Sequence, residues 1–458
     1  MDSVAESQSH KKAARAAAHA QSCREVPDEG VSRNGDLRAG PRGMVEQLAL
    51  VLDQERAVTR LDTRAAIALK ERVRRRVEAD AASLLELSHR IHAHPELAYE
   101  EVRAADWVAA TLEDGGMKVE RRAHGLPTAL RAHAGSKGPN VVLCAEYDAL
   151  PGIGHACGHN VIAASAVGAG LALAGLAEDL GMRVTVLGTP AEESGGGKID
   201  LLRAGAFDDA AVAMMVHPWT SETVDFPTLA WARVEVTYHG KEAHASVTPE
   251  RGLNALDAVN LSYMARAALR QHIHHTDRVH GIINHGGDAP NIVPKLTRAT
   301  YFVRAATGEA LEVLKDRVLC CFEAGAVATG CELEVRWLGN DYHAIAANRT
   351  MGGLYEANLR SLGRSAVPSG LLETGGGSTD MGNVSRVVPS IHPMMSLDSL
   401  PAVNHQVEFA AHAVSAAADR AILDAALAMA WTVVDLVTTP EALERVREEF
   451  DEREVGDP

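Results

Sequence analysis

The sequence lacks the features of a disulfide-stapled, secreted or membrane-spanning protein. Its 458 residues include only six cysteines, with no Cys-x-x-Cys pair or zinc-finger spacing, which fits a reducing, cytoplasmic location. No run of about 18 uncharged apolar residues occurs, so we predict no transmembrane helix. The N-terminus has no continuous apolar segment of the kind that forms a secretory signal.

Positive charge is scarce as well. The chain has 45 Lys and Arg residues against 61 Asp and Glu residues, which gives a net charge of −16. A nucleic-acid partner requires a basic surface, and adhesion to anionic lipid requires clustered Lys and Arg. The composition therefore argues against both kinds of partner.

Two well-known catalytic motifs are incomplete. Ser194–Lys198 resembles a phosphate-binding loop, but such a loop needs Gly and Ser or Thr where this chain has Glu192 and Ile199. No Gly-x-Ser-x-Gly segment occurs, so a serine hydrolase is unsupported.

The length and the pattern of apolar residues predict two domains. A chain of 458 residues is too long for a single core. Residues 1–43 have few large apolar groups, so we expect them to be disordered. Apolar residues at helical spacing then predict helices over residues 45–80 and 81–92.

Further along, short β-rich segments alternate with helical ones. We predict strands over residues 141–146, 183–187 and 212–216, and an alanine- and glycine-rich helix over 161–180. A long helix over 410–438 closes this part of the chain. The alternation predicts an α/β fold with a mixed, mostly parallel sheet flanked by helices.

An insert with a different order of predicted strands and helices interrupts this fold at residues 229–338. Its order is predicted as strand–helix–strand–strand–helix–strand, with helices covering one face of the sheet. The clearest segments are the alternating strands 231–238, 300–304 and 332–337 and the helices 255–268 and 309–324.

Three of the predicted strands are followed at once by side chains that bind metals or transfer protons. These are Asp148 with the His-Ala-Cys-Gly-His segment that holds Cys157 and His159, the pair Glu192-Glu193, and His217. In open parallel sheets, ligands bind beyond the carboxyl ends of the strands, so these side chains are expected to converge.

Their chemistry suits a pair of divalent cations. Thiolate, imidazole and carboxylate together suit Zn²⁺, and also Mn²⁺, Co²⁺ or Ni²⁺. Two such ions about 3.5–4 Å apart can hold an attacking hydroxide and polarise a carbonyl group. Of two adjacent glutamates, one can bind metal while the other accepts a proton from water.

Each residue alone has an ordinary explanation. With 21 histidines, some fall near strand ends by chance, and Glu192-Glu193 alone is typical of a solvated helix start. Cys157 alone would be typical of a buried, inert thiol. Only the joint occurrence of these groups at successive strand ends favours a metal site.

The chain resembles the M20 family of metallopeptidases and amidohydrolases, in particular the branch with a Cys-Gly-His metal motif. The resemblance covers residues 80–435, with the motifs in the same order and at matching spacing. The motifs that carry it are His94–Ala98, Glu146–Pro151, Gly154–Asn160, Thr189–Glu193, Lys241–Ser246, Gly375–Val384 and His405 with Phe409.

The resemblance implies a catalytic α/β domain and an inserted ferredoxin-like α+β domain that acts as a lid and forms a homodimer. On this basis we expect residues 1–75 to be an N-terminal extension, partly disordered and then helical. The catalytic domain would then comprise residues 76–228 and 340–440, the lid and dimerisation domain residues 229–339, and an acidic C-terminal tail residues 441–458.

The resemblance also assigns roles to individual residues. It implies Glu192 as the general base, Asp148 as the residue that orients a ligand, and His244 as the group that stabilises the oxyanion. The implied ligands of two divalent ions are Cys157, His159, Glu193, His217 and His405. The implied substrate-binding residues are Asn291, Arg304, Gly376 and Gly377.

Two departures from the family pattern concern the last ligand. Gln406 follows His405 where Ser or Thr is usual, and Met394 stands where an aromatic residue is expected after His392 and Pro393. His392 is therefore a rival for the fifth ligand, although the downstream Phe409 favours His405.

We predict metal-dependent hydrolysis of an amide bond in a small dipeptide or N-acyl amino acid, by a metal-bound water that Glu192 deprotonates. Among these substrates, the resemblance suggests first unusual dipeptides such as β-alanyl or γ-aminobutyryl conjugates of basic amino acids. Aminobenzoyl-glutamate-type or other N-acyl substrates are the alternative. Two other classes remain: a non-catalytic binding or assembly protein that keeps the fold, and a redox protein that uses Cys157.

Overall fold

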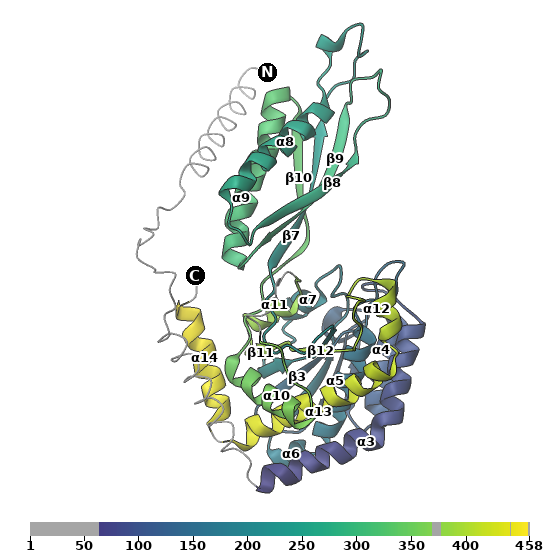
Figure 1. Ribbon diagram of the computed structural model, residues 1–458, viewed down its shortest axis with the longest axis vertical. Coiled ribbons are helices and arrows are strands. Elements are labelled where there is room, and N and C mark those ends of the chain that lie inside the picture. Colours follow the sequence, from purple (N-terminus) through teal and green to yellow (C-terminus); the bar gives the residue numbers. More distant parts are fainter. Residues whose placement is uncertain (1–63, 369–376, 440, 457–458) are drawn as a thin grey trace. The chain divides into compact units, whose positions relative to one another are not determined.

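The computed structural model describes residues 64–368, 377–439 and 441–456. The described residues form two compact units: Trp231–Leu338 is one, and the residues before and after it form the other. Figure 1 shows their elements. The disorder predicted for residues 1–43 falls outside the described residues.

The larger unit is built on a six-stranded mixed sheet (Figure 1). Its strand order is β1-β2-β4-β3-β5-β11, in which β4, β3, β5 and β11 are parallel and the β1-β2 and β2-β4 pairs are antiparallel. This confirms the predicted mixed sheet. The strands are β1 (Lys118–Arg121), β2 (Leu130–Ala134), β3 (Asn140–Ala145), β4 (Arg183–Gly188), β5 (Ala210–Met214) and β11 (Ser390–Ile391).

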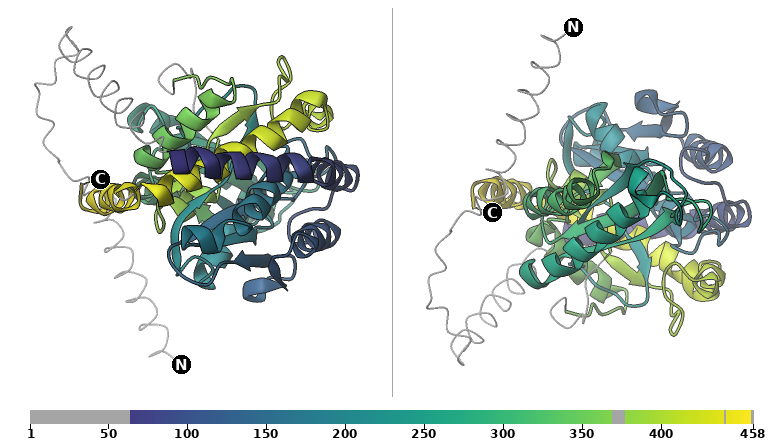
Figure 2. Two further views of the ribbon diagram at one scale, coloured as in Figure 1. Left: turned by 90° about the horizontal axis from the view of Figure 1, so that it is seen from below. Right: turned by 90° about the horizontal axis from the view of Figure 1, so that it is seen from above.

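Helices cover both faces of this sheet. All six residues of β3 are buried, as expected for a central parallel strand. Leu143 packs in the core with α5 (His159–Ala174), which α3 (Arg64–Ala93) and α13 (Ala416–Thr438) cover in turn. Figure 2 shows α3 lying alongside α13. Val142 faces the other way, toward α7 (Gly197–Arg203) and α11 (Met381–Ser385).

The shorter elements of this unit join these layers. β6 and β12 form a separate parallel pair. The elements are α4 (Val102–Asp114), α6 (Ala177–Leu180), α7 (Gly197–Arg203), β6 (His217–Trp219), α10 (Arg349–Ser361), α11 (Met381–Ser385), β12 (Met394–Ser396) and α12 (Val407–His412).

Two predicted helices are each divided into two. The helix predicted over 161–180 ends at Ala174 and resumes as α6. The helix predicted over 410–438 is α12 and α13, because the Ser415 side chain accepts a hydrogen bond from the backbone of Ala418 and starts a new helix. By length and composition α13 could span a membrane, but 78% of its apolar window is buried inside the structure, as in a core helix.

The smaller unit has the ferredoxin-like order that was predicted. Its sheet order is β10-β7-β9-β8, and α8 and α9 pack on each other and on β9. Tyr301 of β9 stacks on Phe322 of α9 with ring centroids 5.3 Å apart. The elements are β7 (Ala230–His239), α8 (Ala255–Leu269), β8 (Arg278–His285), β9 (Leu296–Ala305), α9 (Gly308–Thr329) and β10 (Glu332–Tyr342).

The segment expected to be an acidic tail is instead a helix, α14 (Ala442–Gly456), packed on α10 and α13. Its apolar positions Ala442, Val446 and Phe450 recur at helical spacing and are buried. The Glu449 carboxylate accepts hydrogen bonds from the first backbone N–H groups of α10, which stabilises the start of that helix. These apolar positions were not detected from the sequence, because acidic residues dominate the segment.

The close packing of α5 on the sheet can be tested at Gly170. A Cβ atom there would lie 2.1 Å from the Cγ2 atom of Val186 on β4. We expect Gly170→Ala to lower the free energy of unfolding by about 1–3 kcal/mol, measured by urea denaturation, because overpacking strains the core. Gly175→Ala is the control, since its Cβ would meet no atom closer than 3.8 Å. Equal stability of the two variants would contradict the packing.

Candidate metal-binding site

The carboxyl ends of the parallel strands bring the predicted metal-binding residues to one edge of the sheet. Glu146 and Asp148 follow β3, and Glu192 and Glu193 follow β4. His159 is the first residue of α5, and His217 is the first residue of β6. The backbone N–H of His405 donates to Ala156, which brings a residue from late in the chain to the same place.

Cys157 lies at the centre of the cluster. Its Sγ atom is 3.6 Å from Nε2 of His217 and 3.6 Å from Nε2 of His405. Nε2 of His405 is also 3.6 Å from a carboxylate oxygen of Glu193. Donor atoms of Cys157, His159 and His217 form one group within 4.8 Å of one another, and those of Cys157, Glu193 and His405 form a second group.

These separations match those between ligands of one cation. A tetrahedral Zn²⁺ ion bound at about 2.3 Å by sulfur and about 2.0 Å by nitrogen holds those two donors about 3.5 Å apart. Since the two groups share Cys157, these five residues would suit a pair of divalent ions, which would supply Lewis-acid chemistry there.

Hydrogen bonds at Nδ1 leave Nε2 of His159 and of His217 available to bind a cation. Nδ1 of His159 donates to Oδ1 of Asp148 over 2.9 Å, and Nδ1 of His217 donates to the backbone oxygen of Pro218 over 2.7 Å. In the neutral form of each ring, which is the form that binds a metal ion, Nε2 is then an acceptor that faces the cluster. Nε2 of His159 is buried and makes no hydrogen bond within the described residues, which is costly unless a cation lies nearby.

Asp148 also fixes the glutamate pair. Its second oxygen accepts a hydrogen bond of 2.9 Å from the backbone N–H of Glu193. Ala191 has the left-handed φ of 60°, which is strained for a residue with a side chain. Its carbonyl accepts the N–H of Gly196, and the Tyr342 hydroxyl donates to the carbonyl of Glu192. These bonds hold both carboxylates at the strand end.

Burial and neighbouring charges shift several pKa values here. Burial opposes ionisation of Cys157, but the charge of His217 and hydrogen bonds from the imidazoles outweigh it and hold the thiol pKa well below its usual range. Hydrogen bonds to Cys157 and Glu193 raise the pKa of His405 to about 10. Burial and the Cys157 charge raise the pKa of Glu193 to about 7. Burial, with the charges of Glu146 and Glu193, raises that of Glu192.

The glycine between Cys157 and His159 is required by its surroundings. Gly158 has a φ of 77°, and a Cβ atom there would lie 2.8 Å from the ring of Pro218. A larger residue would therefore push apart the two segments that carry Cys157 and His217.

The geometry favours His405 over its rival. His392 is buried, and its ring centroid lies 5.4 Å from that of His217, but it belongs to none of the donor groups found among the described residues. Burial and the charge of His217 hold the pKa of His392 well below its usual range, so the ring stays neutral. His405, although 58% exposed, faces both Cys157 and Glu193.

Three predicted residues belong to the smaller unit. His244 and Asn291 lie in adjacent segments, joined by a bridge between His244 and Ile292 and by the Ala245 N–H, which donates to the Asn291 carbonyl. Both side chains are exposed. Arg304 lies near the end of β9 and is partly buried, with its guanidinium 5.8 Å from the ring of Trp231.

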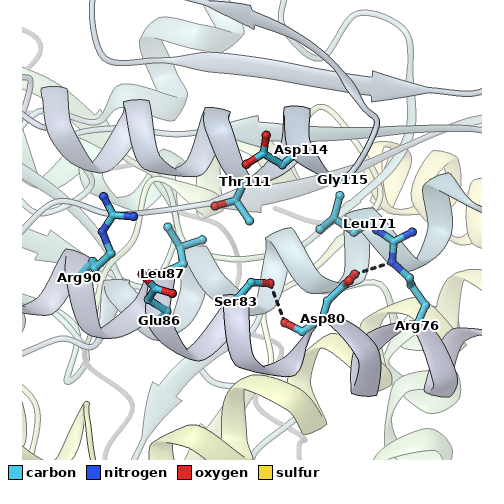
Figure 3. Close-up of a pocket in the computed structure, with 10 residues that line it drawn as sticks. All are labelled: Arg76, Asp80, Ser83, Glu86, Leu87, Arg90, Thr111, Asp114, Gly115 and Leu171. Atoms are coloured by element: carbon cyan, nitrogen blue, oxygen red, sulfur yellow. Dashed lines mark hydrogen bonds and ion pairs between the residues drawn. The ribbon is translucent and has the colours of Figure 1, made fainter.

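Of the two predicted glycines, Gly376 lies outside the described residues. Gly377 is exposed, and its carbonyl accepts the Leu229 N–H. A cleft elsewhere in the larger unit has a volume of about 300 Å³ and contains no predicted site residue. Figure 3 shows this cleft, between α3 and α4, with the ion pair of Arg76 and Asp80 on its wall.

Sequence reasoning missed three charged residues beside the cluster. Lys198 forms ion pairs with Glu146 and Asp380, and all three side chains are completely buried. Lys198 is the lysine of the segment that resembled a phosphate-binding loop. No local signal marked Lys198 as buried, because Asp200 and Arg203 follow it on the same helix and its carboxylate partners come from other parts of the chain.

Comparisons with known proteins identify relatives of this chain. Residues 228–328 match the peptidase dimerisation domain of the M20 family. The chain is 42% identical over 397 residues to the Xaa-Arg dipeptidase of Mus musculus, covering 83% of this chain and 92% of the relative. It is 33% identical over 303 residues to a subunit of the p-aminobenzoyl-glutamate hydrolase of Escherichia coli, covering 61% and 63%.

A solved structure shares the fold. It is a dinuclear metal-binding peptidase of the M20 family from Bacillus subtilis, with a TM-score of 0.62 at 20% identity, covering 79% of this chain and 99% of that one.

The ionisation of Cys157 gives a direct test of the cluster. In metal-free protein we expect the ultraviolet absorbance of its thiolate to be present at neutral pH and to disappear only on strong acidification, because the imidazoles stabilise the anion. Cys157→Ser should remove this titration. Cys144→Ser should retain it, since burial raises the pKa of Cys144 to about 12. A titration unchanged in Cys157→Ser would contradict the assignment.

Proposed function

Because this chain belongs to the M20 family of metallopeptidases, we propose that it hydrolyses an amide bond in a small dipeptide or N-acyl amino acid with the help of two divalent ions. The observation that supports this most strongly is the convergence of one thiolate, three imidazoles and a carboxylate on a shared centre. A non-catalytic binding protein would have no need for the neighbouring Glu192.

The proposed ligands of the two ions are Cys157, His159, Glu193, His217 and His405. Zn²⁺ or Mn²⁺ suits these donors best, and Co²⁺ or Ni²⁺ would also fit them. When bound, such ions polarise the scissile carbonyl group and lower the pKa of the attacking water.

Glu192 is the proposed general base. A carboxylate oxygen of Glu192 lies 4.0 Å from Nε2 of His159, and only 8% of its side chain is exposed. Glu192 accepts the proton from water as the oxygen attacks the carbonyl carbon. It then delivers that proton to the nitrogen of the leaving amine as the carbon–nitrogen bond breaks.

The remaining site residues are proposed to position the reacting groups. Asp148 keeps His159 in the tautomer that presents Nε2 to the cluster. The lid residue His244 would stabilise the oxyanion with a ring N–H. Asn291, Arg304 and the glycines Gly376 and Gly377 would bind the substrate, the guanidinium by pairing with its carboxylate.

Dipeptides with a basic C-terminal residue are the proposed substrates. The Mus musculus relative, named for Xaa-Arg dipeptides, supports this choice through its 42% identity over most of both chains. The Escherichia coli relative, named for p-aminobenzoyl-glutamate, supports the alternative more weakly because only 63% of its length is matched. A cytoplasmic location remains a prediction from the cysteine content.

A homodimer formed through the smaller unit is the proposed assembly. The match to a peptidase dimerisation domain covers most of this unit. Strand β8 lies at the edge of its sheet, where Ile282 is 66% exposed and Ile283 is 40% exposed. An exposed apolar edge strand favours pairing with another strand, here that of a second copy.

The catalytic proposal is tested with Glu192→Gln, which cannot accept a proton. We expect kcat to fall by about 10²- to 10⁴-fold while two ions per chain remain bound. The assay measures amine release from Xaa-Arg and Xaa-Lys dipeptides and from p-aminobenzoyl-glutamate, each with Zn²⁺, Mn²⁺, Co²⁺ or Ni²⁺. Glu193→Gln is the matched control and should lose metal.

Each result decides one point. Full turnover by Glu192→Gln with unchanged metal content would exclude Glu192 as the base. Faster release from p-aminobenzoyl-glutamate would favour the alternative substrate. A wild-type protein that binds metal but cleaves none of these amides would instead be a binding protein.

The dimer is tested with Ile282→Arg. A charge in the middle of the β8 edge should convert the dimer to a monomer, as measured by light scattering during size-exclusion chromatography, because burying an unpaired guanidinium is costly. Val327→Arg on α9 is the control, since Val327 is 83% exposed and lies away from the sheet edge. A wild-type monomer, or equal loss in both variants, would contradict pairing through β8.

A further inference from the structure

A completely buried ion-pair triad lies behind the cluster. The Lys198 ammonium contacts Oε1 of Glu146, and it lies 2.6 Å from Oδ1 of Asp380. The backbone N–H of Lys198 donates to the other oxygen of Asp380 over 2.9 Å. Burial alone would lower the pKa of Lys198, but Asp380 and Glu146 raise it well above its ordinary value. The lysine is therefore charged.

The second oxygen of Glu146 has no such partner. Oε2 is buried, makes no hydrogen bond within the described residues, and lies 3.4 Å from Nε2 of His159. Because Nδ1 of His159 donates to Asp148, the ring in its neutral, metal-binding form presents a lone pair to this oxygen. Two lone pairs at this distance repel each other unless a cation or a proton lies beside them.

The surrounding atoms complete a group of donors. Atoms of Glu146, His159 and Glu192 all lie within 4.8 Å of one another, and all three side chains are buried. Asp380 belongs to no donor group among the described residues. Lys198 occupies Oε1 of Glu146 and so leaves only Oε2 directed at His159.

We propose that Glu146 is an additional oxygen donor to the ion held by His159, and that Lys198 is the positioning residue that fixes it there. This inference rests on the proposed function, because it requires a divalent ion at His159. A further carboxylate makes the position better suited to Mn²⁺, whereas sulfur and nitrogen donors alone favour Zn²⁺. Glu146 would thus bias the choice of metal.

The test compares two variants, each of which neutralises one of the two carboxylates that contact Lys198. Glu146→Gln removes the proposed donor, and Asp380→Asn removes the charge on the other side of Lys198 as the matched control. Lys198→Met releases the carboxylate without changing it. Metal-free proteins are titrated with Mn²⁺ by calorimetry, bound ions are counted by mass spectrometry, and the absorption spectrum of the Co²⁺-loaded form reports the ligand set.

We expect the wild type to bind two ions per chain. Glu146→Gln should weaken Mn²⁺ binding at one of the two positions by about 10- to 100-fold and alter the Co²⁺ spectrum. Lys198→Met should change both readouts in the same direction. Asp380→Asn should keep the wild-type spectrum and affinity. Thermal unfolding monitored by circular dichroism verifies that each variant is folded, and the two isosteric variants decide the matter if Lys198→Met does not fold.

Two results would overturn the inference and leave the proposed function intact. One is a Glu146→Gln protein with wild-type Mn²⁺ affinity and Co²⁺ spectrum, which would mean that a proton occupies the gap beside His159. The other is equal weakening in Glu146→Gln and Asp380→Asn, which would assign the effect to total buried charge. A wild type that binds no divalent ion and cleaves no amide would refute the proposed function itself.

Discussion

The structure depends on balancing negative charge that is buried at one edge of the central sheet. Glu146, Glu192, Asp148 and Asp380 are each no more than 7% exposed there, and the sulfur of Cys157 is beside them. Buried anions are tolerated only when cations or several hydrogen bonds compensate them. Lys198 compensates part of this charge through its contacts with Glu146 and Asp380, and the imidazoles compensate another part. The donor atoms without hydrogen bonds face the space between the imidazoles and carboxylates.

The backbone is arranged to keep these groups close together. Ala191 and His405 both have left-handed φ values, 60° and 68°, that residues with side chains rarely adopt. Each is held by neighbouring hydrogen bonds, through the carbonyl of Ala191 and the N–H of His405. Strain of this kind persists where surrounding contacts fix it, and here it accompanies the placement of the glutamate pair at the strand end and of the His405 ring beside Glu193.

Much of this could be predicted from the sequence, because local patterns encode it. The α/β alternation, the order of strands and helices in the insert and the strand ends near Asp148 and Glu192 follow from the spacing of apolar and polar residues. The partners of Lys198 could not be predicted, since Asp380 lies 182 residues away and only the folded chain brings the two together. The helix breaks at Gly175 and Ser415 could not be predicted, because the alanine-rich sequence on both sides of each break has the composition of a continuous helix.

The C-terminal helix has a practical consequence for recombinant work. Its acidic sequence resembles a dispensable tail that would be deleted from an expressed protein. However, the Arg453 guanidinium donates to the carbonyl of Ser385 at the end of α11, and the Asn348 side chain donates to the carbonyl of Val446. Because α11 begins one residue after Asp380, deleting the chain from Ala442 onward would remove contacts that hold α11, and with it the Asp380 partner of Lys198, in place. A shortened protein of this kind could then bind metal poorly even though none of its proposed ligands had been deleted.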